Sequence, residues 1–175
     1  MNSTDHTRYW HILDSPVGPL LLGGDGERLT RIDFQDGPRP LRPAAHWQRS
    51  AAPFAEAIEQ LTQYFAGRRR SFDLPLASIG TEFQQRVWQA LRVIPYGTTL
   101  SYGELASRIG NARASRAVGL ANGANPLPVV VPCHRVIGAD GALTGFGGGV
   151  PIKRALLTLE GALPAELPYA AVAAH

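Results

Sequence analysis

The spacing of hydrophobic residues changes part-way along this chain, and that change limits the folds open to it. Between residues 9 and 34, three short apolar segments are separated by proline- and glycine-rich turns, a pattern that predicts a β-meander. From residue 54 onward, apolar residues recur every three or four positions, which is the period of an amphipathic helix. We therefore expect an α+β protein with a small N-terminal β-meander plus helix and a mostly helical C-terminal domain.

The boundary between the two predicted domains lies near Ile79. Residues 1–78 hold the expected strands and a helix with one apolar face over residues 54–65, and residues 79–163 form the second domain. Residues 164–175 are rich in proline and alanine and are expected to form a loose tail.

Two capping boxes predict where helices of the second domain begin. Thr81 with Gln84, and Ser101 with Glu104, have the spacing in which a hydroxyl and a side chain three residues later satisfy each other's backbone N–H groups. The second box starts a short helix over residues 102–109, which a Gly-Asn turn separates from a third helix over residues 112–123. This is the outline of a helix-turn-helix, although many proteins use such a pair for packing alone.

The third predicted helix is rich in alanine and glycine, and its only large side chains near the start are Arg113 and Arg116. Each glycine costs a helix up to about 1 kcal/mol relative to alanine. Either a ligand approaches the helix backbone closely, or the helix packs tightly on another helix.

The composition narrows the class of protein. Hydrophobic residues make up 45% of the 175 residues and the formal net charge is +3, which is typical of a globular protein and compatible with a modest phosphate-binding face. No segment approaches the roughly 20 apolar residues that span a bilayer, and we expect no secretory signal and no membrane partner. One cysteine allows no internal disulfide, and the five histidines lack ligand spacing. We expect no metal, no cofactor and a reducing, cytoplasmic location.

The single cysteine follows a Val-rich segment, residues 127–131, that predicts a buried strand. Taken alone, Cys133 is best explained as a small buried hydrophobe and His134 as a structural histidine. Side by side they also suit a nucleophile and its base, because the thiolate is the reactive form of cysteine. A carboxylate could orient the imidazole; Glu160 is the acidic residue that we nominate, although spacing alone does not choose it over Asp140.

The segment Pro132-Cys133-His134-Arg135-Val136, preceded by Asn125-Pro126, resembles the active site of the O6-alkylguanine-DNA alkyltransferases, the methylated-DNA–protein-cysteine methyltransferases of the single-chain bacterial type. The resemblance is dense over about residues 80–161 and implies an RNase H-like N-terminal domain. Its further motifs are Phe83-Gln84-Gln85-Arg86-Val87-Trp88, Pro95-Tyr96-Gly97, Ser101-Tyr102, Arg116-Ala117-Val118-Gly119, Leu156-Leu157 and Glu160-Gly161, with Ser15-Pro16-Val17-Gly18-Pro19-Leu20 in the N-terminal part.

The resemblance implies a DNA-repair enzyme that acts once, transferring the alkyl group of O6-alkylguanine, and of O4-alkylthymine, irreversibly to Cys133. The partner is double-stranded DNA, bound by a monomer through the minor groove with little sequence preference and in some cases cooperatively, and the damaged nucleotide is flipped out of the helix. The implied catalytic residues are Cys133, His134 and Glu160; the implied substrate-binding residues are Tyr102, Asn125, Val136, Phe146 and Gly147; the implied DNA-binding residues are Arg116, Ala117, Gly119, Ala121, Asn122 and Gly123.

Two positions depart from the family pattern. Phe146 stands where many members carry tyrosine, so it keeps an apolar wall and lacks the hydroxyl. Asn122 occupies a recognition-helix position that is arginine in some relatives, which predicts weaker non-specific binding to DNA.

Three other functions compete with alkyl transfer. A non-catalytic lesion binder of the related alkyltransferase-like type lacks the cysteine that this chain has. A hydrolase needs turnover, and a dithiol catalyst needs a second cysteine. A transcription factor with a helix-turn-helix needs polar side chains that read bases, and an alanine- and glycine-rich surface reads little.

Overall fold

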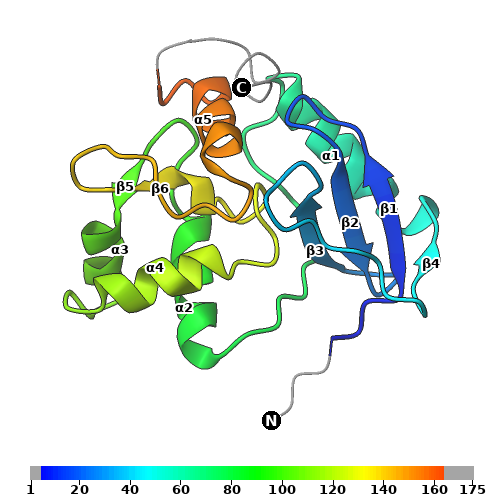
Figure 1. The fold of residues 1–175 in the computed structure, drawn as a ribbon, viewed down its shortest axis with the longest axis horizontal. Coiled ribbons are helices and arrows are strands. Elements are labelled where there is room, and N and C mark those ends of the chain that lie inside the picture. The colour runs from blue at the N-terminus through cyan, green and yellow to red at the C-terminus, as the bar shows by residue number, and fades with distance from the viewer. Residues whose placement is uncertain (1–4, 164–175) are drawn as a thin grey trace.

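The computed structural model describes residues 5–163, which form two lobes (Figure 1). The N-terminal lobe contains β1 (Tyr9–Leu13), β2 (Leu20–Gly24), β3 (Leu29–Phe34), β4 (Gln48–Arg49), a short 3-10 helix η1 (Ala52–Phe54) and α1 (Ala55–Phe65). The sheet order is β3-β2-β1-β4, with antiparallel pairing inside the meander and parallel pairing of β1 with β4. The predicted β-meander and the helix after it are therefore confirmed. The two-residue strand β4 is too short to leave a pattern in the sequence.

The C-terminal lobe is mainly helical, as expected. It contains α2 (Glu82–Arg92), β5 (Leu100–Ser101), α3 (Tyr102–Arg108), α4 (Ser115–Gly123), a 3-10 helix η2 (Cys133–Arg135), β6 (Val136–Ile137) and α5 (Val150–Leu159). Strands β5 and β6 pair in parallel and join the start of α3 to the residues that follow Cys133. Within residues 5–163, no helix is long and apolar enough to cross a membrane.

Both predicted capping boxes are present and fix the first turns of α2 and α3. The side chain of Thr81 accepts from the Gln84 N–H at 3.1 Å, and that of Ser101 accepts from the Glu104 N–H at 3.1 Å. Helix α4 begins at residue 115, three residues later than predicted, because the residues before it form a turn in which the Ala114 N–H donates to the Asn111 carbonyl. Helix α2 packs on α4, and the Trp88 indole N–H donates to the Ala121 carbonyl at 2.8 Å.

The strand predicted over residues 127–131 is wrong, because this buried segment is a series of turns. Pro126 and Pro128 lack the N–H groups that a strand needs. Val129 has a φ of 74°, a left-handed conformation that is unfavourable for a β-branched residue. The Val131 N–H donates back to the Leu127 carbonyl at 2.8 Å. These turns direct the chain into η2, which starts with Cys133.

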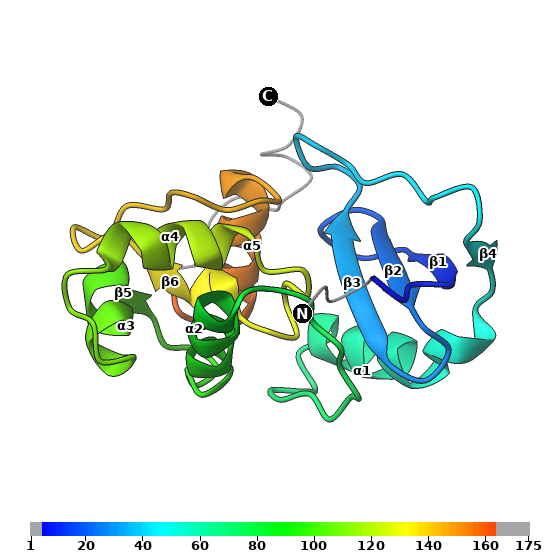
Figure 2. The same ribbon diagram turned by 90° about the horizontal axis from the view of Figure 1, so that it is seen from below.

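The two lobes meet along β3 and the segments around the cysteine. The N–H of Ile32 on β3 donates to the Pro126 carbonyl at 2.9 Å. The ring of Phe34, at the end of β3, packs on that of Phe146 with 5.5 Å between centroids. Helix α1 lies along one face of the sheet (Figure 2) and faces the C-terminal lobe at its Tyr64 end. Residues of the N-terminal lobe therefore reach the neighbourhood of Cys133.

Candidate active site

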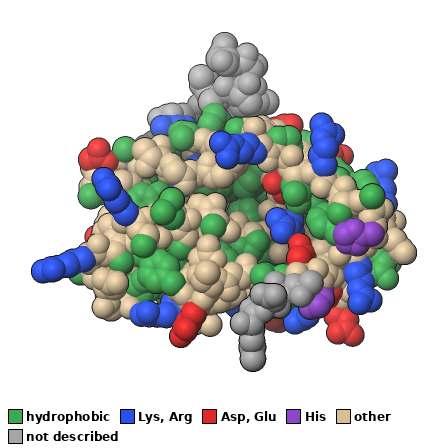
Figure 3. Space-filling model, turned by 60° about the horizontal axis from the view of Figure 1, so that its bottom comes forward, with side chains coloured by type: hydrophobic (Ala, Val, Ile, Leu, Met, Phe, Trp, Pro, Cys, Tyr) green, Lys and Arg blue, Asp and Glu red, His purple; other side chains and the backbone are tan. Residues whose placement is uncertain are grey.

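Cys133 lies at the edge of a cavity of about 320 Å³ between the lobes. Its side chain is 4% exposed. The face drawn in Figure 3 is hollowed between the lobes, with hydrophobic side chains inside the hollow and arginine and lysine side chains around it. Cys133 is therefore buried from bulk solvent and still borders a space that both lobes enclose. The cavity is lined by Ile32, Asp33, Phe34 and Arg39 of the N-terminal lobe and by Asn122, Gly123, Asn125, Pro128, Phe146, Gly147 and Gly148 of the C-terminal lobe.

The thiol of Cys133 is neutral in the resting protein. Burial raises its pKa from 9.0 to about 11, although the Asn125 side chain, the positive charge of Lys153 and the backbone N–H groups of Cys133 and His134 act in the opposite direction. The surroundings thus stabilise a thiolate in part, but its formation needs a base.

His134 is fully buried next to the cysteine and is held by Glu160. Its Nε2 lies 2.7 Å from the Glu160 Oε2. Burial alone would raise the pKa of Glu160, but hydrogen bonds and charge from His134 and Arg135 hold it well below the usual range. The carboxylate is therefore ionised, so Nε2 carries the proton of the bond.

The other ring nitrogen of His134 is available to accept a proton. Nδ1 is buried and has no hydrogen-bond partner among residues 5–163. Burial lowers the pKa of His134 below 6.5, so the ring is neutral near pH 7. With the proton on Nε2, the lone pair is on Nδ1, which is the arrangement a general base requires.

Arg135 holds the carboxylate of Glu160 in place. Its Nε donates to the Glu160 Oε1 at 2.7 Å and its Nη2 to Oε2 at 3.0 Å, while Nη1 donates to the Ile94 carbonyl at 2.7 Å. Of the two acidic residues that the sequence left open, Glu160 contacts His134. Asp140 is exposed and accepts from the Ala142 N–H.

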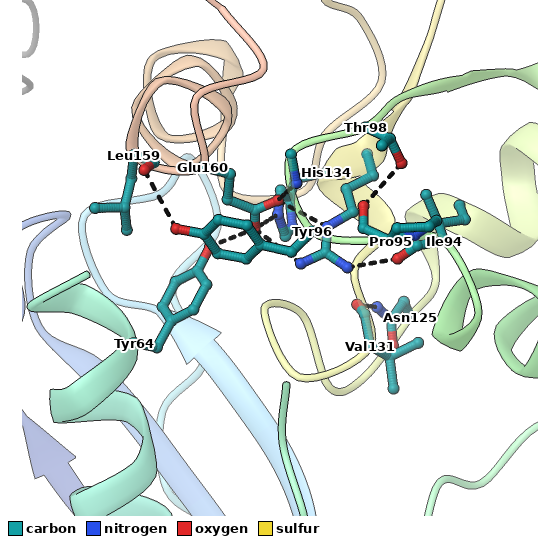
Figure 4. A network of polar contacts seen from close by, with 12 residues as sticks. Tyr64, Ile94, Pro95, Tyr96, Thr98, Asn125, Val131, His134, Leu159 and Glu160 are labelled. Atoms are coloured by element: carbon teal, nitrogen blue, oxygen red, sulfur yellow. Dashed lines mark hydrogen bonds and ion pairs between the residues drawn. The ribbon is translucent and has the colours of Figure 1, made fainter. Parts of the chain in front are cut away.

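Two buried residues in this region carried no signal in the sequence. Tyr64 of α1 donates its hydroxyl to the Glu160 Oε2 at 2.7 Å (Figure 4), and it was expected only as part of a helix. Lys153 of α5 donates its Nζ to the carbonyls of Val136 and Thr144 at 2.5 and 2.9 Å. Burial lowers the pKa of Lys153 to about 8. A lysine at 0% exposure that binds two backbone carbonyls fixes the position of the Val136 carbonyl.

Asn125 and Phe146 both line the cavity that Cys133 borders. The Asn125 Nδ2 donates to the Val131 carbonyl at 2.8 Å, and its Oδ1 accepts from the Leu127 N–H at 3.0 Å. Asn125 therefore holds together the turns between α4 and Cys133. Phe146 is buried and lines the cavity, with Gly147 beside it.

The exposed face of α4 is formed by small residues, one arginine and one leucine. Arg116, Ala117 and Gly123 are exposed, and the side chain of Leu120 is 79% exposed. This face continues into an open groove of about 540 Å³, in which the Tyr102 hydroxyl donates to the Thr144 carbonyl at 3.0 Å. The groove is lined by Tyr102, Ser115, Arg116, Gly119, Leu120, Thr144 and Gly145.

Two residues expected to face DNA are instead turned inward. Ala121 is 3% exposed and Asn122 is 1% exposed. The Asn122 Nδ2 donates to the Cys133 carbonyl at 3.3 Å, so this side chain supports the cysteine segment. The physical reason is helical periodicity, since residues 118, 121 and 122 lie on the side of α4 that packs on the core.

The glycines of α4 are not required by packing within the described chain. A Cβ at Gly123 would have no neighbour within 4 Å, and one at Gly119 would meet the Tyr102 ring at an ordinary distance of 3.7 Å. Tight packing on another helix, the alternative that the sequence left open, therefore does not explain these two residues.

Comparison with known proteins identifies relatives of both lobes. Residues 82–162 match the family model described as the 6-O-methylguanine DNA methyltransferase DNA binding domain, and residues 8–78 match that of its ribonuclease-like domain. A methylated-DNA–protein-cysteine methyltransferase of Methanosarcina acetivorans is 54% identical over 87% of this chain and 98% of its own length. A protein of that description from Mycobacterium bovis is 53% identical over 91% of this chain and 96% of its own length.

Solved structures agree with these relatives. The crystal structure of Mycobacterium tuberculosis OGT in complex with DNA has a TM-score of 0.84 and 51% sequence identity, covering 92% of this chain and 98% of that chain. Among residues 5–163, no group of three or more His, Cys, Asp or Glu side chains is arranged to hold a metal ion.

Proposed function

The chain belongs to the 6-O-methylguanine DNA methyltransferase family, and on that premise we propose that Cys133 removes the alkyl group from O6-alkylguanine in DNA and keeps it. The observation that carries this proposal is the free Nδ1 of a buried, Glu160-bound histidine next to the only cysteine, at the edge of a cavity. O4-alkylthymine, which presents a similar alkylated oxygen, is a second substrate.

The transfer is a single displacement. His134 takes the proton of the Cys133 thiol through a bridging water, the sulfur attacks the alkyl carbon, and the bond from that carbon to the guanine O6 breaks. Glu160 stabilises the imidazolium formed in this step. The guanine leaves as an anion, is protonated and remains in the DNA as normal guanine.

Groups that line the cavity, together with Val136 and with Tyr102 of the groove beside α4, receive the guanine. The carbonyls of Cys133 and Val136 accept from its amino group, the N–H of Gly147 donates to the oxygen on which charge grows, and Tyr102 hydrogen-bonds the ring. Phe146 packs on the alkyl group as an apolar wall. A backbone donor placed where charge develops is the element that lowers the barrier.

The product is a thioether, which lacks the acyl carbon that water could attack. The protein therefore has no route back to the free thiol and repairs one lesion per molecule. This distinguishes it from a cysteine hydrolase, in which water releases an acyl-enzyme in every cycle.

We assign DNA binding to the exposed face of α4. A helix with small residues on its outer face can enter the minor groove, which is about 6 Å wide. Arg116 fills the stack when the damaged nucleotide turns out toward Cys133. Contacts of this kind read few bases, so the binding is sequence-tolerant and weakens with salt. We expect a monomer that acts in the cytoplasm, where a single thiol stays reduced.

Intact mass after exposure to DNA carrying O6-methylguanine tests the proposal. The expected result is one methyl group per protein molecule, located on the peptide that contains Cys133, and no gain in Cys133→Ala. Turnover of many lesions per molecule, or transfer that survives in Cys133→Ala, would contradict the mechanism. A second experiment with O4-methylthymine in the same sequence tests the second substrate.

A further inference from the structure

We propose that Tyr64, a residue of the N-terminal lobe, is a positioning residue for alkyl transfer, because its hydroxyl shares one carboxylate oxygen with His134 and thereby sets how strongly Glu160 holds the imidazole. The inference rests on the proposed function, since it takes His134 to be the base for Cys133. It assigns a part in the chemistry to a lobe whose sequence contains none of the catalytic motif.

The contacts around Glu160 are unevenly divided between its two oxygens. Oε2 accepts from the Tyr64 hydroxyl at 2.7 Å, from the His134 Nε2 at 2.7 Å and from the Arg135 Nη2 at 3.0 Å. Oε1 accepts from the Arg135 Nε at 2.7 Å and from the Gly97 N–H at 3.5 Å. A carboxylate oxygen has two lone-pair sites, so three donors on Oε2 compete for its charge.

Tyr64 acts as the donor in this contact. Its side chain is fully buried, and burial together with the negative charge of Glu160 raises the pKa of its hydroxyl well above 10.0. An ionised carboxylate can only accept. The hydroxyl proton therefore remains on Tyr64 and draws charge from the oxygen that His134 uses.

The ring of Tyr64 is held independently of its hydroxyl. It packs on Phe65, Phe72 and Tyr96 with centroid distances of 5.2, 5.4 and 6.3 Å. Phenylalanine at this position would keep these contacts and lose only the hydrogen bond. Figure 4 shows the hydroxyl reaching from α1 toward the carboxylate that also meets His134.

Removing this donor should make His134 more basic. The groups that face the His134–Glu160 pair are Arg135 on η2 and Lys153 on α5, which both disfavour the imidazolium, and Tyr64 on α1, which weakens the acceptor that favours it. Without the hydroxyl, more of the negative charge on Oε2 is available to Nε2. The imidazolium becomes more stable, and His134 is half protonated at a higher pH.

The test compares Tyr64→Phe with Tyr96→Phe. Tyr96 is a matched control, because its hydroxyl donates to the Leu159 carbonyl at 3.3 Å and not to Glu160. The rate constant for one round of methyl transfer from a short O6-methylguanine duplex is measured from pH 5 to pH 9. At low pH the rate falls because His134 becomes protonated, and this part of the pH–rate profile is its acid limb. For a hydrogen bond of ordinary strength, we expect Tyr64→Phe to shift the acid limb to higher pH by about half a pH unit.

The pH dependence of the rate change in Tyr64→Phe distinguishes a positioning role from a general loss of structure. On the acid limb, Tyr64→Phe should be roughly three-fold slower than the unmodified protein, and near pH 9 it should not be slower. The NMR signal of the His134 Nε2 proton should also move downfield, because its bond to Oε2 strengthens. Tyr96→Phe should leave both the pH profile and this signal in place.

The inference would be overturned if Tyr64→Phe changed neither the pH of the acid limb nor the chemical shift of the His134 Nε2 proton. A rate that falls equally at every pH, as in a merely loosened protein, would also overturn it. Failure of the proposed function is distinguishable, since the unmodified protein would then gain no methyl group on Cys133 while the Nε2 signal could still respond to Tyr64.

Discussion

The exposed face of α4, to which DNA binding is proposed, and the buried cluster around Glu160, to which the chemistry is proposed, differ in burial and in charge. The face of α4 presents small side chains, Arg116 and Leu120 to solvent, and its glycines have no neighbours that need them. The cluster buries the carboxylate of Glu160 against Arg135, His134 and Tyr64. Changes on the face should therefore alter DNA binding and leave the fold intact. Changes in the cluster should alter chemistry and stability together, because an unpaired buried charge is costly.

The largest effect should follow from Glu160→Gln. The substitution removes the negative charge between Arg135 and His134 at nearly constant volume. The free energy of unfolding should fall by about 3–5 kcal/mol, since the buried Arg135 loses its counter-charge. The rate of methyl transfer should fall by about 100-fold or more, since the imidazolium loses its stabilising partner. Urea unfolding and single-turnover kinetics measure the two losses.

Asp140→Asn is the control for Glu160→Gln, because it removes one exposed carboxylate and should change neither quantity. The stability difference also has a predicted pH dependence. The pKa of Glu160 is held below its usual 4.5 in the folded state, so its contribution is complete above that pH and is lost as the pH falls through the folded-state value. If the difference in free energy of unfolding between the unmodified protein and Glu160→Gln stayed constant down to pH 2, it would contradict the ion pair between Arg135 and Glu160.

The next effect concerns the reactivity of the thiol. Because burial raises the pKa of Cys133 from 9.0 to about 11, the native protein at pH 8 should hold about 100-fold less thiolate than the urea-unfolded chain. Iodoacetamide should modify native Cys133 correspondingly slowly, and mass spectrometry follows this directly because the chain has one cysteine. Equal rates in the native and unfolded states would indicate a thiolate already formed at rest.

The same shift affects stability at alkaline pH. The folded state keeps the Cys133 proton to a higher pH than the unfolded chain, so this group reduces stability as the pH rises from 9.0 to about 11. Lys153 has the opposite effect on stability. Burial lowers its pKa from 10.5 to about 8, so the folded state loses this proton at a lower pH than the unfolded chain and becomes more stable as the pH rises between these two values. Lys153→Met should therefore make the alkaline loss of stability steeper.

On the exposed face, Arg116→Ala should separate DNA handling from chemistry. Arg116 is the side chain proposed to replace the extruded nucleotide, so without it repair of duplex DNA should slow by about 30-fold, the equivalent of a flipping cost of about 2 kcal/mol. Reaction with the free base O6-benzylguanine and the urea midpoint should not change. Arg92→Ala removes one charge from an exposed position on α2 and serves as the control. Equal losses on duplex and free base would remove Arg116 from this role.

The sequence predicted local features of the fold well, because local signals encode them. The capping boxes at Thr81 and Ser101 and the alternating strands of the meander depend on neighbours within a few residues. The segment 127–131 was predicted as a strand because of its apolar residues, which are indeed buried, while Pro128 and the preceding Pro126 disfavour sheet pairing. Burial and strand formation are separate properties, and the hydrophobic pattern reports only the first.

The site residues that the sequence predicted are those that belong to a recognisable motif. The link from His134 to Glu160 spans 26 positions; Glu160 was nominated from the residues, but spacing did not exclude Asp140, and the family resemblance supported Glu160. The link from Tyr64 to Glu160 spans 96 positions, and a tyrosine on an apolar helix face gives no sign of a distant partner. Asn122 was placed on the DNA side, although the helical period turns it toward Cys133. Contacts of this kind depend on how the two lobes meet, which no local pattern records.

The smallest effect should come from Gly123→Ala, and it tests the contrast between face and cluster most directly. A Cβ at this position has no neighbour within 4 Å, and alanine favours a helix over glycine by up to about 1 kcal/mol. The substitution should therefore raise the free energy of unfolding slightly. In the proposed complex its methyl group faces the minor groove, so it should weaken duplex binding a few-fold. Fluorescence anisotropy at fixed salt and urea unfolding measure the two changes.

The control for Gly123→Ala is Ser107→Ala, which changes an exposed helical position on α3 without adding bulk. Gly67→Ala is unsuitable as a control, because Gly67 has a φ of 75° and alanine would be strained there. If Gly123→Ala bound DNA as tightly as the unmodified protein, the small residues of α4 would no longer be explained by close approach of the groove.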